Sequence, residues 1–150
     1  MHCELASKLI VLALLFSISV LTHAEQSQDF GDYVVHFNAL NTNLLAPKVA
    51  KEYGITRSNQ RAMLNVAVQR KKLGTTVQPI AAQVTATATN LAGQTKGLEM
   101  REIKEPYAIY YISEFPVSNE ETLNFTLSIQ PQGSDIEPLV VRFRQQFFVP

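Results

Sequence analysis

Residues 80–89 have the sequence Ile-Ala-Ala-Gln-Val-Thr-Ala-Thr-Ala-Thr, in which small apolar and polar side chains alternate over most of the stretch. Successive side chains of a β-strand point to opposite faces, so this alternation is typical of a strand with one buried and one solvated face. We therefore predict a strand whose even-numbered residues face a core, namely Ile80, Ala82, Val84, Ala86 and Ala88.

Six further stretches alternate in the same way, or are apolar on both faces as in a central strand. They are residues 33–39, 64–68, 97–103, 107–115, 123–130 and 139–144. Turn residues separate them, such as Leu73-Gly74, Ala92-Gly93 and Pro131-Gln132-Gly133. Seven short strands at this spacing predict an all-β fold, an antiparallel immunoglobulin-like β-sandwich of about seven strands. The paired cysteines and the tryptophan of true immunoglobulin domains are absent, so the likeness concerns architecture only.

One short connector helix is expected between the first two strands. Pro47 suits a first helical position and Gly54 suits a left-handed stop, so we predict about two turns of helix between them. Ala46 provides no polar side chain to cap this helix.

Both ends of the expected domain depart from the alternating pattern. Residues 25–29 are polar, and we expect them to form a frayed terminus. In the last strand Gln145 falls where an apolar residue is expected. Either a bulge that returns Phe147 to the inner face or simple fraying would account for it.

Residues 1–24 have the pattern of a secretory signal peptide. Lys8 precedes an apolar run of 13 residues, and Thr22-His23-Ala24 has small residues at its first and third places. The run is too short to span a bilayer, which needs about 20 residues. We predict cleavage after Ala24, with an uncleaved anchor as the alternative, and one β-sandwich domain over residues 25–150. The protein is therefore expected in the periplasm.

The composition of the expected mature chain excludes several classes of function. Removing 24 of the 150 residues leaves 126, with 12 Lys and Arg against 12 Asp and Glu, no cysteine and one histidine. The balanced charge lacks the basic footprint of a nucleic-acid-binding protein. No later segment is long and apolar enough to cross a bilayer, so we expect no stable membrane insertion. A single histidine without cysteine predicts no metal site, and we expect no cofactor.

The sequence also lacks the motifs of common catalytic sites. It contains no Gly-x-Ser-x-Gly elbow and no glycine-rich phosphate loop. Its many glutamates lie mostly at expected turns or on polar strand faces. We therefore predict no enzyme activity and no catalytic residues. A hydrolase that uses His36 or a glutamate is the weaker alternative.

Four polar residues are the candidates for binding a partner: His36, Asn38, Arg57 and Arg61. The first two lie on an expected strand, where His36 is otherwise interpreted as a partly buried histidine bonded to a neighbouring backbone group. The stretch Arg57-Ser58-Asn59-Gln60-Arg61 has the residues to cradle a carboxylate or a phosphate. In the alternative interpretation it is a loop whose arginines pair with nearby acids.

Several stretches resemble the domain-of-unknown-function 4426 family of small exported gammaproteobacterial proteins. The resemblance is carried by Tyr33-Val34-Val35-His36-Phe37-Asn38-Ala39-Leu40 and continues over residues 45–55, 57–61, 64–68 and 141–147. The ordered set spans the mature chain and is stronger in its first half. The resemblance implies a periplasmic sandwich without an established activity, and it supplies no catalytic residues.

These observations predict a non-catalytic periplasmic binding or accessory domain. Sandwiches present strand edges and end loops, either of which can take a strand or peptide from another envelope protein. The alternatives are a small-ligand carrier, which requires a concave apolar pocket, and, less favoured, a hydrolase. The sequence leaves the partner, the strand order and the oligomeric state open.

Overall fold

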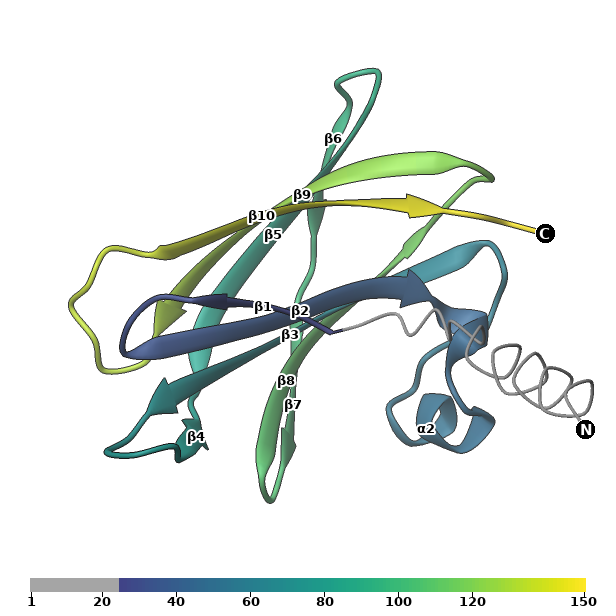
Figure 1. The fold of residues 1–150 in the computed structure, drawn as a ribbon. Coiled ribbons are helices and arrows are strands. Elements are labelled where there is room, and N and C mark those ends of the chain that lie inside the picture. Colours follow the sequence, from purple (N-terminus) through teal and green to yellow (C-terminus); the bar gives the residue numbers. More distant parts are fainter. Residues whose placement is uncertain (1–24) are drawn as a thin grey trace, which may run out of the picture.

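Residues 25–150 are described by the computed structural model, and they form two antiparallel β-sheets packed face to face (Figure 1). Sheet A has six strands: β1 (Gln26–Asp29), β2 (Tyr33–Asn41), β3 (Arg61–Lys71), β8 (Ala108–Pro116) and β7 (Arg101–Glu105) in that order, with β4 (Val77–Pro79) also paired to β3. Sheet B has the order β10 (Leu139–Phe147), β9 (Glu121–Pro131), β5 (Ala82–Asn90) and β6 (Thr95–Leu98). The prediction of an all-β antiparallel sandwich is confirmed. The predicted signal peptide lies outside the described residues.

The core lies between the two sheets and follows the alternation in the sequence. On β5 the side chains of Val84, Ala86 and Ala88 are buried, and Gln83 and Thr85 are exposed. The facing β3 of sheet A contributes the fully buried Leu64 and Val66, and the other strands of sheet B contribute Leu127, Ile129 and Val141. Because inward positions on both sheets are apolar, burial of these side chains stabilises the sandwich without any disulfide.

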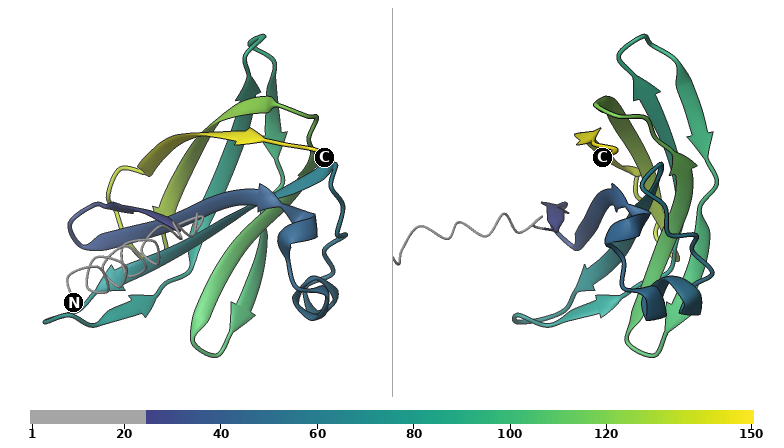
Figure 2. Two further views of the ribbon diagram at one scale, coloured as in Figure 1. Left: turned by 45° about the vertical axis from the view of Figure 1, so that its right-hand side comes forward. Right: turned by 90° about the vertical axis from the view of Figure 1, so that its right-hand side faces the viewer.

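The predicted strand 97–103 is two strands in the structure. Residues 95–98 belong to β6 in sheet B, and residues 101–105 belong to β7 in sheet A. The chain therefore crosses between the sheets at Glu99 and Met100, and Figure 2 shows the continuous ribbon at this crossing. An alternating pattern continues unchanged through such a crossing, which is why the sequence indicated one strand.

The terminal segment 25–29 is not frayed as expected, because β1 pairs with β2. Its four residues lie opposite Val34–Phe37. The Asp29 carboxylate lies 2.5 Å from the Lys71 ammonium, and this hydrogen bond lowers the pKa of Asp29 below its ordinary value. Backbone pairing and this ion pair hold a strand that has no apolar side chain of its own.

Strand β10 contains no bulge. Its pairing with β9 is continuous from Leu139 opposite Ile129 to Phe147 opposite Glu121. Phe143, Gln145 and Phe147 are two residues apart and share one face, so Phe147 reaches the core in the regular register, where it is 1% exposed. Gln145 is thus an inward-facing polar residue near the end of the sandwich.

The predicted connector helix is present as α2 (Pro47–Glu52), preceded by the short 3-10 helix η2 (Thr42–Leu44). Pro47 occupies the first helical turn, Ala46 makes no capping bond, and Gly54 follows with a φ of 65°. The connector, defined here as residues 42–60, lies against the outer face of sheet A. Its buried residues Ala50 and Ile55 pack there on a second, smaller apolar cluster around Met63. No helix within residues 25–150 is long and apolar enough to cross a bilayer.

Candidate functional site

The four predicted binding residues lie at two places on the outer face of sheet A. His36 and Asn38 project from β2, two residues apart on the same face. Arg57 belongs to the connector and Arg61 begins β3. In the register of β2 and β3, the pair formed by Leu40 and Met63 lies between the two places, under the connector. The structure therefore groups the four residues in two pairs and does not bring all four together.

His36 is engaged by side chains and not by the backbone. Its Nε2 lies 2.9 Å from the Gln69 amide oxygen, and its Nδ1 lies 3.7 Å from a Glu25 carboxylate oxygen. An amide oxygen only accepts, so Nε2 carries a proton and donates it to Gln69. Ser27 lies opposite His36 on β1, yet no hydrogen bond between these two side chains is found in the described part of the chain. In this tautomer the lone pair of the ring lies on Nδ1, on the side of the Glu25 carboxylate.

Asn38 and Asn65 form a polar pair in the middle of the outer face. They are direct cross-strand partners on β2 and β3. The Oδ1 atom of each is buried and has no hydrogen-bond partner among residues 25–150. An unpaired buried acceptor costs about 1–3 kcal/mol of stability. Sequence analysis found Asn38 but missed Asn65, because only strand pairing brings the two together.

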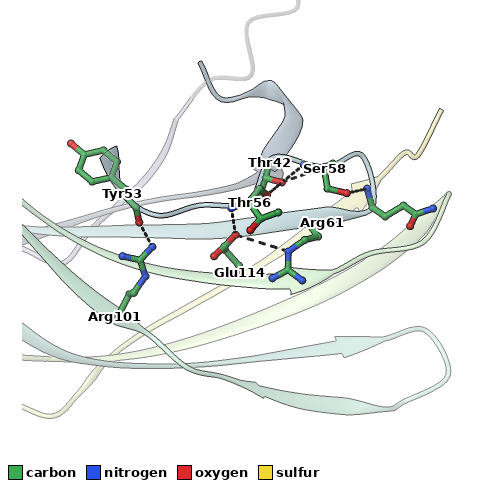
Figure 3. A network of polar contacts seen from close by, with 8 residues as sticks. Thr42, Tyr53, Thr56, Ser58, Arg61, Arg101 and Glu114 are labelled. Carbon is green, nitrogen blue, oxygen red and sulfur yellow. Dashed lines mark hydrogen bonds and ion pairs between the residues drawn. The ribbon is translucent and has the colours of Figure 1, made fainter. Parts of the chain in front are cut away.

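Arg61 and Thr56 meet the Glu114 carboxylate of β8 where the connector joins the sheet (Figure 3). Arg57 donates to the Asn43 carbonyl at 2.9 Å, within the connector itself. Arg61 Nε lies 4.0 Å from a Glu114 carboxylate oxygen, which also accepts the Thr56 N–H at 3.0 Å. Arg61 thus lies beside an acid, as in the interpretation of this stretch as a loop, whereas Arg57 contacts a backbone carbonyl and no acid of the described chain.

Thr42 completes this fastening from inside the connector. Its fully buried hydroxyl accepts the Ser58 N–H at 3.0 Å and lies 2.8 Å from the Thr56 carbonyl, to which it donates. Figure 3 shows these contacts beside the Glu114 carboxylate. The connector is therefore a fixed part of the outer face and not a free loop.

Tyr53 joins the connector to strand β7 at two points. Its hydroxyl donates to the Glu105 carboxylate at 2.9 Å, and its carbonyl accepts a short hydrogen bond from Arg101. The hydrogen bond to Glu105 requires the phenol proton, and it raises the pKa of Tyr53 above its ordinary value. Of these two contacts, only the one to Glu105 depends on the protonation of Tyr53.

A groove of about 260 Å³ lies at one side of the sandwich, where the ends of β2 and β10 run side by side (Figure 1). Its rim carries two apolar side chains that are well exposed, Leu44 at 64% and Phe148 at 60%. Gln145 lines the groove, and its amide donates to the Gln146 carbonyl at 2.9 Å. Asn43 also lines it and has a buried Oδ1 without a partner among the described residues.

Two strand edges border this groove without a neighbouring strand in residues 25–150. Strand β10 pairs only with β9, and β1 covers only Val34–Phe37 of β2. The last part of β2, Asn38–Asn41, therefore pairs with β3 alone. Sequence analysis missed Leu44 and Phe148, and the one signal that pointed here was the inward polar residue Gln145.

The side chains of residues 25–150 offer no group of three or more His, Cys, Asp or Glu arranged to hold a metal ion. The groove between β2 and β10 combines open strand edges with an apolar rim, and both features suit a polypeptide.

Comparison with known proteins gives a family and two related folds. The model of the DUF4426 family, described as a domain of unknown function, matches residues 27–150. The crystal structure of a DUF4426 family protein from Pseudomonas aeruginosa PAO1 is 36% identical, with a TM-score of 0.71 over 84% of this chain and 96% of that one. No curated protein matches the chain.

A more distant likeness concerns the fold alone. FetP from uropathogenic Escherichia coli strain F11, expressed recombinantly in the periplasm, is 11% identical with a TM-score of 0.61, over 83% of this chain and 94% of that one. A copper-bound variant of FetP is similar at a TM-score of 0.59 and 11% identity, over 83% and 95% of the two chains. Copper binding is a property of that protein.

Proposed function

The chain belongs to the DUF4426 family, a domain of unknown function, and from this premise we propose that it is a non-catalytic binding domain of the periplasm. In this proposal an extended polypeptide of another envelope protein pairs with the free edge of β10. The observation that carries the proposal is the groove between β2 and β10. An unpaired edge offers backbone N–H and C=O groups in a row, and an added strand satisfies them.

The side chains around the groove support a peptide as the occupant. A bound strand places alternate side chains toward the groove, where Leu44 and Phe148 offer apolar contact. The buried Asn43 oxygen provides an acceptor for a donor group of the peptide. Apolar anchors combined with main-chain pairing are the usual sources of affinity and specificity in strand addition.

The non-catalytic part of the proposal rests on the single histidine of the described chain. His36 Nε2 is bonded to Gln69, and Nδ1, which carries the lone pair in that tautomer, faces a Glu25 carboxylate oxygen at 3.7 Å. A general base needs a free lone pair within hydrogen-bond reach of its nucleophile. The periplasmic part rests on the signal-peptide pattern of residues 1–24.

Site-specific photocrosslinking in intact cells tests the proposal. A benzophenone side chain is placed at Leu44 or Phe148 in the groove, and at Leu91 or Tyr107 as matched exposed apolar positions on distant hairpins. We expect both groove positions to capture the same envelope protein and both control positions to capture none. Equal capture from all four positions, or none from the groove, would contradict the proposal.

A second variant separates specific pairing from general stickiness. Phe148→Asp places a charge on the rim without altering the core, since the side chain is largely exposed. We expect the crosslink from Leu44 to be lost in this variant while the far-ultraviolet circular dichroism stays unchanged. Retention of the crosslink would show that Phe148 plays no part in binding.

A further inference from the structure

A second cavity lies on the outer face of sheet A, away from the groove. It has a volume of about 250 Å³ and lies between the connector and the sheet, partly open to solvent. The connector contributes Leu45, Val49 and Tyr53, and the sheet contributes Met63, Asn65 and Ile112. An apolar cavity of about 150 Å³ is large enough for benzene, so this one has room for a two-ring molecule.

The walls of the cavity are fixed before any ligand arrives. Met63 and Ile112 are 6% and 3% exposed, and they belong to two paired strands of sheet A. The connector above them is held by Tyr53, through its hydroxyl to Glu105 and its carbonyl to Arg101. A largely preformed cavity loses little conformational entropy when it binds a small molecule.

The polar group at the floor of the cavity is an amide without a partner. Asn65 Oδ1 is buried and accepts no hydrogen bond from residues 25–150, and its cross-strand neighbour Asn38 has the same unpaired oxygen. The terminal torsion of an asparagine is soft, so Oδ1 can turn toward a donor inside the cavity at little cost. No charged residue of the described chain lines the cavity, and Glu105 and Arg101 are each engaged by Tyr53, which favours an uncharged ligand.

We propose that this cavity binds a small, uncharged, mainly apolar molecule that donates one hydrogen bond to Asn65 Oδ1. The flat rings of Tyr53 and Tyr110, which both line the cavity, suit an aromatic body. The hydrogen-bond donor of the ligand fixes the orientation of the ligand in the cavity. An apolar molecule without a donor would leave both asparagine oxygens unpaired. This site is separate from the peptide groove and stands independently of it.

Three probes of nearly the same shape test the proposal. Indole has an N–H donor, benzofuran replaces it with a weak acceptor, and indene has neither. Binding to residues 25–150 is followed by the chemical shifts of the methyl groups of Met63 and Ile112. We expect indole to bind with a dissociation constant of about 0.1–1 mM, and about fivefold more tightly than either analogue. Equal binding of the three probes, or preference for benzofuran, would overturn the donor assignment.

Two variants and one control locate the interaction. Asn65→Leu keeps the approximate shape and removes the acceptor, so indole should lose its advantage over indene. Ile103→Phe adds bulk at the wall and should weaken all three probes alike. Asn124→Leu, at a mid-strand position on the outer face of sheet B, should leave the preference for indole unchanged.

Probe binding is compared only for variants whose amide NMR signals are dispersed as in the folded wild-type chain. If Asn65→Leu keeps the full preference for indole, or if the shift changes map away from Met63 and Ile112, the proposal is wrong. The outcome is read from the ratio between probes, which a general change in stability does not alter.

Discussion

Tyr53 is the residue through which the connector depends on pH. Its hydroxyl donates to the Glu105 carboxylate, and this bond raises the pKa of the phenol. A raised pKa in the folded state means that the neutral form stabilises the fold. The stabilisation is complete below the unfolded value of about 10 and is lost as the pH rises through the folded pKa.

We therefore expect the free energy of unfolding to fall more steeply in the wild type than in Tyr53→Phe as the pH rises above about 10. The measurement is urea unfolding followed by far-ultraviolet circular dichroism at several values of pH. The pKa of Tyr111 is also raised, chiefly by burial, but this group is present in both proteins and cancels in the difference. Parallel pH profiles would show that the bond to Glu105 has no energetic role.

Asn38 and Asn65 show how a residue can be placed correctly and still be understood only in part. The alternation of β2 puts Asn38 opposite the core-facing residues, as the structure shows. Its importance depends on Asn65, which lies beside it. Two adjacent buried oxygens without hydrogen bonds lower the stability of the fold, whereas a single exposed asparagine does not. The proposed ligand would relieve part of that cost.

At the scale of elements, the connector depends on how the helix α2 ends. Gly54 has a φ of 65°, in the left-handed region, and its N–H bonds to the Lys51 carbonyl. The Ile55 N–H then bonds to the Ala50 carbonyl at 2.8 Å, so the chain turns back and buries Ile55 against the sheet. A residue with a Cβ atom is strained in this conformation.

We expect Gly54→Ala to lower the free energy of unfolding by about 1 kcal/mol. An added Cβ atom meets nothing within 4 Å at Gly54, so the loss would come from the backbone alone. Gly97→Ala is the matched control, since its Cβ atom also meets nothing within 4 Å and its φ is not left-handed. Urea unfolding compares the two variants, and a loss as large in Gly97→Ala would refute the backbone explanation.

At the scale of the whole molecule, an aromatic cluster joins the two sheets. Phe125 on β9 stacks on Phe143 of β10, with ring centroids 4.7 Å apart and planes inclined by 12°. Phe143 in turn contacts Phe37 of sheet A at 4.7 Å, and Phe125 contacts Phe115 of sheet A at 5.8 Å. A chain with a single cysteine has no internal disulfide, so non-covalent contacts such as these hold the two sheets together.

Phe125→Ala should therefore cost about 3–5 kcal/mol, through lost burial and the cavity it leaves. This is a large part of the stability of a domain of this size, which is about 5–15 kcal/mol in total. Tyr107→Ala, at a hairpin tip where the ring is 91% exposed, should change the stability by less than about 0.5 kcal/mol. Thermal and urea unfolding measure both, and a loss below about 1 kcal/mol in Phe125→Ala would contradict the role given to the cluster.

The sequence by itself determined where most of the strands lie, which of their faces is buried and where the connector helix begins and ends, although it missed β1 and β4 and joined β6 to β7. These properties follow from local rules: a period of two in hydrophobicity, a proline at the first helical position and a glycine at the left-handed stop. For the same reason it placed His36 and Asn38 on the outer face of a strand and Arg57 and Arg61 beside the connector.

Only the tertiary structure decided which strands pair and what those pairs bring together. Residues 97–103 keep one alternating pattern although β6 and β7 belong to different sheets, because side-chain periodicity carries no information about strand partners. Asn65 lies opposite Asn38, and Phe148 and Leu44 line the same groove, through pairing and packing between segments far apart in the chain. Both proposed sites depend on such contacts, whose free energy is gained only when the two sheets and the connector assemble.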